Sequence, residues 1–202
     1  MIQTELVLAS GSFIRRKLLE DAGLKFTVQP PDVDETAIKK AVQNGTESLP
    51  PADIAQILAQ TKAQTVSGQN PDQLTIGADQ VLSFEGRLYS KPHCTDAARD
   101  QLFELRGNSH ELISAVCVAR NGETLWSYEQ SAVLTMRDFS NEFLGRYLAE
   151  MGETVCESVG GYKLEGRGVQ LFEKIEGDYF TILGLPLLAL LEFLRSQRPE
   201  LN

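Results

Sequence analysis

The dipeptide Asn121–Gly122 stands between two long segments of strand-forming residues. Residues 111–120 and 124–137 contain many of the β-branched and aromatic side chains that favour extended backbone. Asn-Gly between two such segments is a strong signal for a two-residue hairpin turn. An antiparallel pair therefore interrupts a chain in which strand-like and helix-like segments otherwise alternate. We expect an α/β fold with a mixed twisted sheet flanked by helices, and not a purely parallel sheet.

The other elements are predicted from apolar spacing and from residues that begin or end helices. Predicted helices cover residues 12–23, 52–68, 95–107, 140–152 and 186–197. Predicted strands cover residues 5–10, 25–30, 74–84 and 87–91, and two more surround a turn within 169–184, whereas 158–168 is loop-like. A chain of 202 residues suits one domain, which we place over residues 1–202.

Composition narrows the class of protein. Hydrophobic residues make up 42% of the chain, enough for a sizeable core, and the net charge is −9. This acidic balance argues against a partner that is a nucleic acid polymer, which would need a broad basic surface. The apolar stretch 181–194 is too short to span a bilayer and contains Pro186. The first residues lack a signal-peptide pattern, so we expect a soluble cytoplasmic protein without a membrane partner.

Cysteine and histidine are scarce. The three cysteines are far apart, and the two histidines form no CxxC or HxxxH spacing. This pattern argues against a zinc site and is typical of reduced thiols. A Ser-His-Asp triad stays open as an alternative, although the chain has no GxSxG segment to support it.

Residues 8–16, LASGSFIRR, place a strand, two serines and an arginine pair at the start of a helix. Helix N-termini carry partial positive charge, so Arg15 and Arg16 are unfavourable there unless something negative binds. Ser10, Gly11 and Ser12 would supply hydroxyls and backbone N–H groups to such an anion. The alternative is a solvated basic turn in which Ser12 caps the helix.

Asp79 lies near the end of the apolar strand predicted at 74–84, where open α/β sheets commonly bind ligands. A carboxylate among Ile76 and Val81 costs free energy unless it is paired or binds a metal. Such a group can act as a general base. The alternative, more common for an isolated Asp, is a turn residue that caps local N–H groups.

Three further features are individually weak. Lys62, Lys91 and the acidic loop that contains Glu35 are each of a kind that is normally solvated. Carboxylates are nevertheless what Mg²⁺ needs when it is shared with substrate phosphates. Together with the anion cradle and Asp79, they suit a phosphate ester or anhydride attacked by water with the help of a metal ion.

Eight segments, in order along the chain, resemble the sequence patterns of the Maf family of nucleoside triphosphate pyrophosphatases. Residues 8–26 resemble the pattern LASxSPxRxxLLxxxGxxF, 77–82 resemble GxD[TQ]xV and 175–187 resemble IxGxxxxVxGLPL. The other five segments are 34–36, 58–63, 90–92, 105–116 and 159–168. The resemblance covers nearly the whole chain.

The resemblance implies a mixed α/β fold, similar to that of inosine triphosphate pyrophosphatase, with two lobes around a cleft, and commonly a homodimer. It implies an enzyme that hydrolyses a nucleoside triphosphate between its α and β phosphates, with Mg²⁺ or Mn²⁺ as cofactor. By position in the matching segments, Asp79 would be the catalytic proton acceptor, and Glu35 and Asp79 the metal ligands. The matching phosphate-binding residues are Ser10, Ser12, Arg15, Lys62 and Lys91.

Three positions bear on the base of the nucleotide. Gln80 and Glu165 match the 7-methyl-GTP type of the family, whereas the dTTP/UTP type carries Thr and Gln there. Ile14 matches neither type, since it offers neither the Arg of one nor the Trp of the other. We expect a guanine-type or 7-methyl-GTP preference. The alternatives are a dTTP/UTP-preferring pyrophosphatase, a non-catalytic nucleotide-binding regulator of cell division, and a general phosphomonoesterase.

Overall fold

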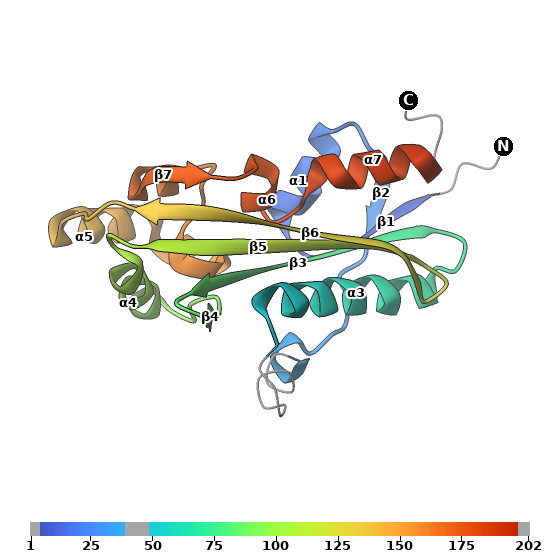
Figure 1. Cartoon of the computed structure of the whole chain (residues 1–202), viewed down its shortest axis with the longest axis horizontal. Coiled ribbons are helices and arrows are strands. Elements are labelled where there is room, and N and C mark those ends of the chain that lie inside the picture. The colour runs from blue at the N-terminus through green and yellow to red at the C-terminus, as the bar shows by residue number, and fades with distance from the viewer. Residues whose placement is uncertain (1–4, 39–48, 198–202) are drawn as a thin grey trace. The chain divides into compact units, whose positions relative to one another are not determined.

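The computed structural model describes residues 5–38 and 49–197, which form two compact units (Figure 1). Within these ranges, unit 1 comprises residues 5–38, 49–80, 114–130 and 184–197, and unit 2 comprises 81–113 and 131–183. Strands β3 (Leu74–Phe84), β5 (Ser109–Arg120) and β6 (Glu123–Met136) contribute residues to both units. No helix in the described ranges is long and apolar enough to cross a bilayer. That residues 1–202 form one functional domain stays a prediction.

Unit 1 contains a sheet with the strand order β2–β1–β3–β5–β6. Strand β1 (Leu6–Ala9) is buried throughout and pairs in parallel with both of its neighbours, β2 (Phe26–Val28) and β3. A strand in a parallel arrangement is covered on both faces, which is why its sequence is continuously apolar. In unit 2, β4 (Arg87–Tyr89) and β7 (Phe172–Glu176) pair antiparallel with β3 and β6. The predicted mixed sheet is confirmed.

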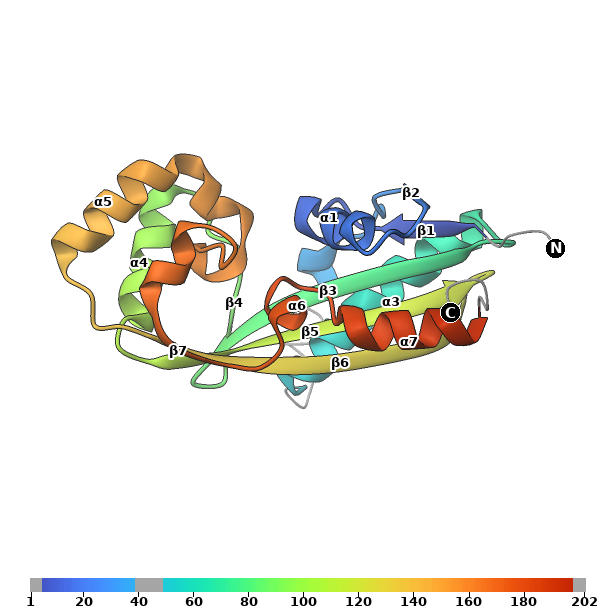
Figure 2. The same cartoon turned by 90° about the horizontal axis from the view of Figure 1, so that it is seen from above.

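Helices cover both faces of the unit 1 sheet. Figures 1 and 2 show α3 (Pro51–Gln69) on one side of its strands, and α1 (Phe13–Asp21) and α7 (Leu187–Gln197) on the other. Strand β6 contacts helices on both faces, because the side chains of consecutive strand residues point to opposite faces of the sheet. Trp126 stacks on Phe193 of α7 with ring centroids 4.9 Å apart, and Ser127 accepts a hydrogen bond of 2.8 Å from Gln56 of α3.

The turn between β5 and β6 has the conformation that Asn-Gly predicts. Asn121 and Gly122 have φ values of 50° and 79°, as the two central residues of a type I′ hairpin turn require. The N–H of Gly122 also donates a hydrogen bond of 2.9 Å to the hydroxyl of Ser67 on α3. The turn is therefore tied to the helix that covers one face of the sheet.

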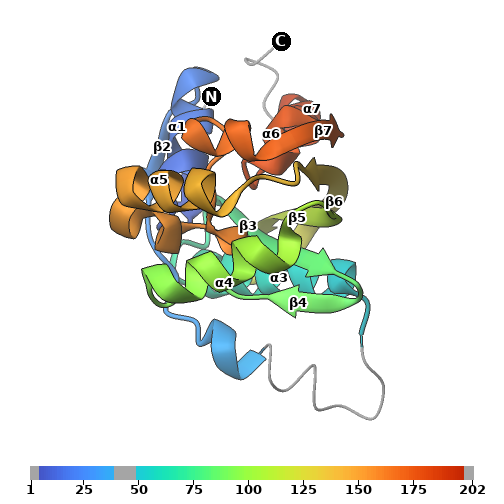
Figure 3. The same ribbon diagram turned by 90° about the vertical axis from the view of Figure 1, so that its left-hand side faces the viewer.

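Unit 2 packs helices against short helical turns. Figures 2 and 3 show α4 (Thr95–Leu105) beside α5 (Asn141–Met151). The segment 158–168, predicted as a loop, contains the 3₁₀ turn Val159–Gly161, and a second 3₁₀ turn, Arg167–Leu171, begins at its end. The prediction of two strands within 169–184 is wrong, because β7 is followed by the short helix α6 (Tyr179–Ile182). The carboxylate of Asp178 accepts a hydrogen bond of 2.8 Å from the N–H of Thr181, which caps this helix and ends the extended chain.

His110 is a buried titratable group in unit 2. It is 3% exposed, and its Nε2 lies 2.6 Å from the hydroxyl of Tyr162, with the ring of Phe172 nearby. Burial lowers the pKa of His110 from 6.5 to about 4 and raises the pKa of Tyr162 well above its ordinary value. The imidazole is therefore neutral in the folded protein at neutral pH.

This burial predicts a pH-dependent stability. Between pH 4 and 6.5 the unfolded chain binds a proton at His110 that the folded chain does not. The free energy of unfolding should therefore fall with decreasing pH across this window, by up to about 1.4 kcal/mol per pH unit from this residue. Urea unfolding at several pH values measures the slope. His110→Gln should flatten it, whereas His93→Gln, at an exposed position, should not. Equal slopes in wild type and His110→Gln would contradict the assignment.

Candidate active site

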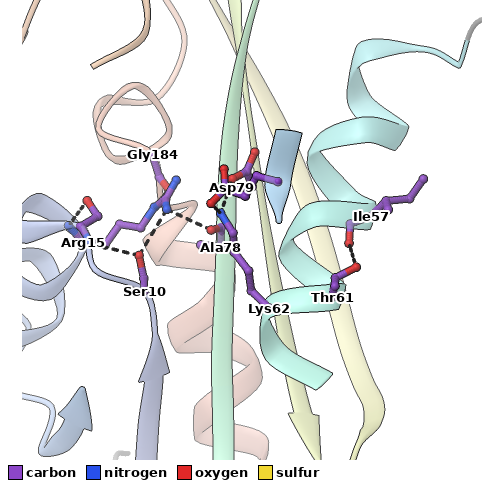
Figure 4. A network of polar contacts seen from close by, with 10 residues as sticks. Ser10, Arg15, Ile57, Thr61, Lys62, Ala78, Asp79 and Gly184 are labelled. Atoms are coloured by element: carbon purple, nitrogen blue, oxygen red, sulfur yellow. Dashed lines mark hydrogen bonds and ion pairs between the residues drawn. The ribbon is translucent and has the colours of Figure 1, made fainter. Parts of the chain in front are cut away.

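One buried lysine joins the two carboxylates that were predicted as metal ligands. Asp79 of β3 is 4% exposed and Lys62 of α3 is 5% exposed. The Nζ atom of Lys62 lies 2.5 Å from Oδ1 of Asp79 and 2.7 Å from Oε1 of Glu35. Figure 4 shows the Lys62 side chain reaching Asp79. Glu35 begins a helical turn that Asp34 caps by accepting a hydrogen bond of 2.9 Å from the N–H of Ala37.

Gly77 sets the spacing between Lys62 and Asp79. A Cβ atom at position 77 would overlap the carbonyl oxygen of Ala59 and lie 2.6 Å from the backbone nitrogen of Ala63, so the backbones of β3 and α3 touch there. Residues 77 and 79 face the same side of the strand. The side chain of Asp79 therefore points toward the helix that carries Lys62. Sequence analysis missed Gly77, although a glycine inside a strand is a signal for close backbone approach.

The second carboxylate oxygen of Asp79 has no partner among the described residues. Oδ2 is buried and makes no hydrogen bond within the part of the chain that the structure describes. A buried charged oxygen without a partner is costly, so such an atom is suited to a water, a metal ion or a substrate proton. The described residues contain no cluster of three or more His, Cys, Asp or Glu side chains placed to hold a metal ion. Asp79 with Glu35 nevertheless fits Mg²⁺, which commonly takes one or two carboxylates plus substrate phosphates.

The hydrogen bonds of the Arg15 side chain account for a basic residue in the first turn of α1. Its side chain leaves the helix, and Nε donates a hydrogen bond of 2.7 Å to the carbonyl of Gly184 (Figure 4). Its Nη1 donates to the carbonyl of Ala78 at 2.9 Å and to the hydroxyl of Ser10 at 3.4 Å. Burial lowers the pKa of Arg15, and the charges of Asp79 and Glu35 oppose that shift. The guanidinium therefore ties α1 to the residue before the candidate base.

Gly184 is a second residue that sequence analysis missed. It lies just before α7 with φ at 93°, a left-handed conformation that favours glycine, and its carbonyl accepts from Arg15. The sequence offered only the weak signal of a glycine ahead of Leu185 and Pro186.

The two serines of the cradle differ in their surroundings. The hydroxyl oxygen of Ser10 accepts hydrogen bonds from the N–H of Ser12 at 3.2 Å and from Arg15, so both of its lone pairs are used and its hydrogen can donate outward. Ser12 caps α1 by accepting from the N–H of Arg15 at 3.4 Å, as predicted. Arg16, expected to join the cradle, instead pairs with Glu20 at 2.7 Å on the helix surface.

The chain matches one family model, described as Maf-like protein, over residues 5–197. The chain belongs to the Maf family. It is 48% identical over 194 residues to the 7-methyl-GTP pyrophosphatase of Brucella abortus, and the aligned region covers 96% of both chains. It is 51% identical over 195 residues to the nucleoside triphosphate pyrophosphatase of Caulobacter vibrioides, again 96% of both chains. It is 50% identical over 190 residues to that of Paramagnetospirillum magneticum, 94% of this chain and 97% of the relative. The family recognised from the sequence patterns is confirmed.

These Maf relatives carry two different names at nearly equal identity, so overall similarity does not distinguish between them. Of the three positions expected to read the base, Ile14 is half-buried in the first turn of α1. Gln80 follows Asp79, and its side-chain nitrogen donates a hydrogen bond of 3.0 Å to Ser114. Glu165 is exposed in unit 2, as is the predicted phosphate ligand Lys91. The roles of these side chains toward a nucleotide stay predictions.

Proposed function

We propose that this Maf protein hydrolyses a nucleoside triphosphate between the α and β phosphates and releases a monophosphate and pyrophosphate. The observation that carries the proposal is Asp79, a buried carboxylate with one oxygen paired to Lys62 and the other without a hydrogen-bond partner among the residues that the structure describes. A carboxylate held in place by one oxygen can accept a proton from water at the other. The relatives named above are pyrophosphatases, which supports the same reaction. We further propose a cytoplasmic homodimer.

The remaining residues would bind the triphosphate. Arg15 and Lys62 supply positive charge, and Ser10 and Ser12 supply hydroxyl donors at the N-terminus of α1. Lys91 is proposed as a further phosphate ligand. Mg²⁺ or Mn²⁺, which Glu35 and Asp79 would hold, neutralises phosphate charge when bound.

Gln80 and Glu165 are proposed to favour guanine over a pyrimidine base. A carboxylate can accept hydrogen bonds from the N1–H and the amine of guanine, whereas uracil and thymine offer one N–H donor and two repelling carbonyls. As an anion, Glu165 also favours the cationic 7-methylguanine. Ile14 provides no aromatic face, and base–aromatic stacking is worth about 1–3 kcal/mol, so we expect a shallow preference.

A nucleotide panel tests the reaction and the base together. With Mg²⁺, we expect pyrophosphate and a monophosphate as products, and roughly ten-fold higher kcat/KM for 7-methyl-GTP or GTP than for dTTP or UTP. Glu165→Gln should level this ranking, whereas Glu173→Gln, at another exposed position of unit 2, should keep it.

Each other outcome of the panel points to a different alternative. Orthophosphate as the product would indicate a phosphomonoesterase. Binding without any product would indicate a regulator. A ranking led by dTTP and UTP would contradict the proposed base preference.

A further inference from the structure

Lys62 lies where a divalent cation would be needed. Its ammonium contacts Oδ1 of Asp79 at 2.5 Å and Oε1 of Glu35 at 2.7 Å, the two carboxylates proposed to hold the metal ion. The side chains of Lys62 and Asp79 are each 6% exposed, so little water screens the contact between them, whereas the Glu35 side chain is 45% exposed. A monovalent cation supplied by the chain itself thus already compensates one of the two negative charges of the pair.

We infer that the Lys62 ammonium competes with the divalent cation for these two carboxylates, so that the free protein binds the metal weakly. The inference rests on the proposed function, because it concerns the metal ion of that same site. An ammonium and a divalent ion on the same carboxylates repel each other, and this repulsion is strong where water is excluded. The ammonium must therefore move away, or the metal ion binds with reduced affinity.

The unpartnered oxygen of Asp79 supports a ligand at this point. Oδ2 is buried and makes no hydrogen bond within the described residues, although the other oxygen of the same carboxylate is paired with Lys62. A site built only for an internal ion pair would satisfy both oxygens. One oxygen of the Asp79 carboxylate therefore remains for a partner that residues 5–38 and 49–197 do not supply.

Binding of the triphosphate would draw the Lys62 ammonium away from the two carboxylates. Lys62 has a flexible four-carbon stem and is also a proposed phosphate ligand, so its ammonium can pass from the carboxylates to a phosphate. Phosphate charge would draw the ammonium away and would at the same time add ligands for the metal ion. Substrate and metal binding would then strengthen each other, and by linkage each would raise the affinity for the other by the same factor.

Mn²⁺ binding to the free protein tests the inference. Metal-free, nucleotide-free protein is titrated with Mn²⁺, and free Mn²⁺ is measured by electron paramagnetic resonance. Lys62→Met should lower the dissociation constant at least about ten-fold, a change of about 1.4 kcal/mol. Lys17→Met is the matched control, because Lys17 pairs with Asp21 at 2.9 Å on the helix surface and its loss changes the net charge equally. Lys17→Met should leave the affinity unchanged.

Two further variants locate the effect. Lys62→Met with Asp79→Asn should lose the gain, since the carboxylate that holds the added Mn²⁺ is gone. Circular dichroism shows whether Lys62→Met folds. If it does not, Lys62→Gln, which keeps a hydrogen-bond donor for Asp79, is titrated in its place. Mn²⁺ affinity no higher than wild type in the folded Lys62 variant, or an equal gain in Lys17→Met, would overturn the inference.

The titration contains no nucleotide, so its result does not depend on turnover. A wild-type protein that hydrolyses no triphosphate would remove the proposed function, whereas equal Mn²⁺ affinities would remove only the competition by Lys62.

Discussion

Replacing Asp79 with asparagine is expected to lower kcat by roughly 10²–10⁴-fold, the usual contribution of a general base, while nucleotide binding survives. Asparagine has nearly the same shape, and its carbonyl can still accept the hydrogen bond from Lys62. The amide cannot take a proton from water at the position of Oδ2. Pyrophosphate release with Mg²⁺ measures turnover, and calorimetry with the preferred triphosphate in the absence of divalent metal ions measures binding.

Asp72→Asn is the matched control for this variant, because Asp72 is an exposed carboxylate of the same unit. It should retain wild-type turnover. Near-normal activity in Asp79→Asn would show that another group accepts the proton. Loss of metal-free nucleotide binding together with activity would show that Asp79 also keeps the site folded.

Arg15→Ala is expected to lower kcat/KM by roughly 10- to 150-fold for all nucleotides alike, since a hydrogen bond to a charged group contributes about 1.5–3 kcal/mol. The variant removes the donor to Ser10 and leaves the carbonyls of Ala78 and Gly184 without the guanidinium. It should therefore also lower the free energy of unfolding, measured in urea. A loss confined to one base would contradict a role at the phosphates.

Two variants separate the charge of Arg15 from its geometry. Arg15→Lys keeps the charge but not the planar fork that reaches two carbonyls at once, so we expect it to remain impaired. Arg16→Ala removes the neighbouring arginine, which pairs with Glu20 on the surface, and should behave as wild type. Full activity in Arg15→Lys would indicate that only the charge matters.

Local patterns predicted much of the fold. The Asn121–Gly122 turn requires positive φ at both residues, and Ser12 caps α1 through its own hydroxyl, so neighbouring residues suffice to specify both features. The segment 169–184 was mispredicted because its apolar residues fit a strand as well as a short helix. The hydrogen bond from the N–H of Thr181 to Asp178 caps a helix there and favours it over a strand.

The candidate site was predictable as a set of residues but not as an arrangement. Asp79 on a strand and Lys62 on a helix could each be found from the sequence, but the expectation that Asp79 lies near the end of its strand is wrong, because it lies in the middle of β3. That one ammonium contacts both Asp79 and Glu35 depends on the packing of three segments. The contact of Arg15 with Gly184 joins residues 169 positions apart. No periodicity or spacing contains that information.

The contact at Gly77 bears on how the site responds to heat. Backbone atoms of Ala59 and Ala63, rather than the ends of flexible side chains, fix the distance between α3 and β3. Warming excites side-chain rotation well before it separates a helix from the strand on which it rests. The carboxylate of Asp79 and the stem of Lys62 should thus keep their relative positions at temperatures at which exposed side chains already move freely. Thermal inactivation should then coincide with unfolding of unit 1 rather than precede it.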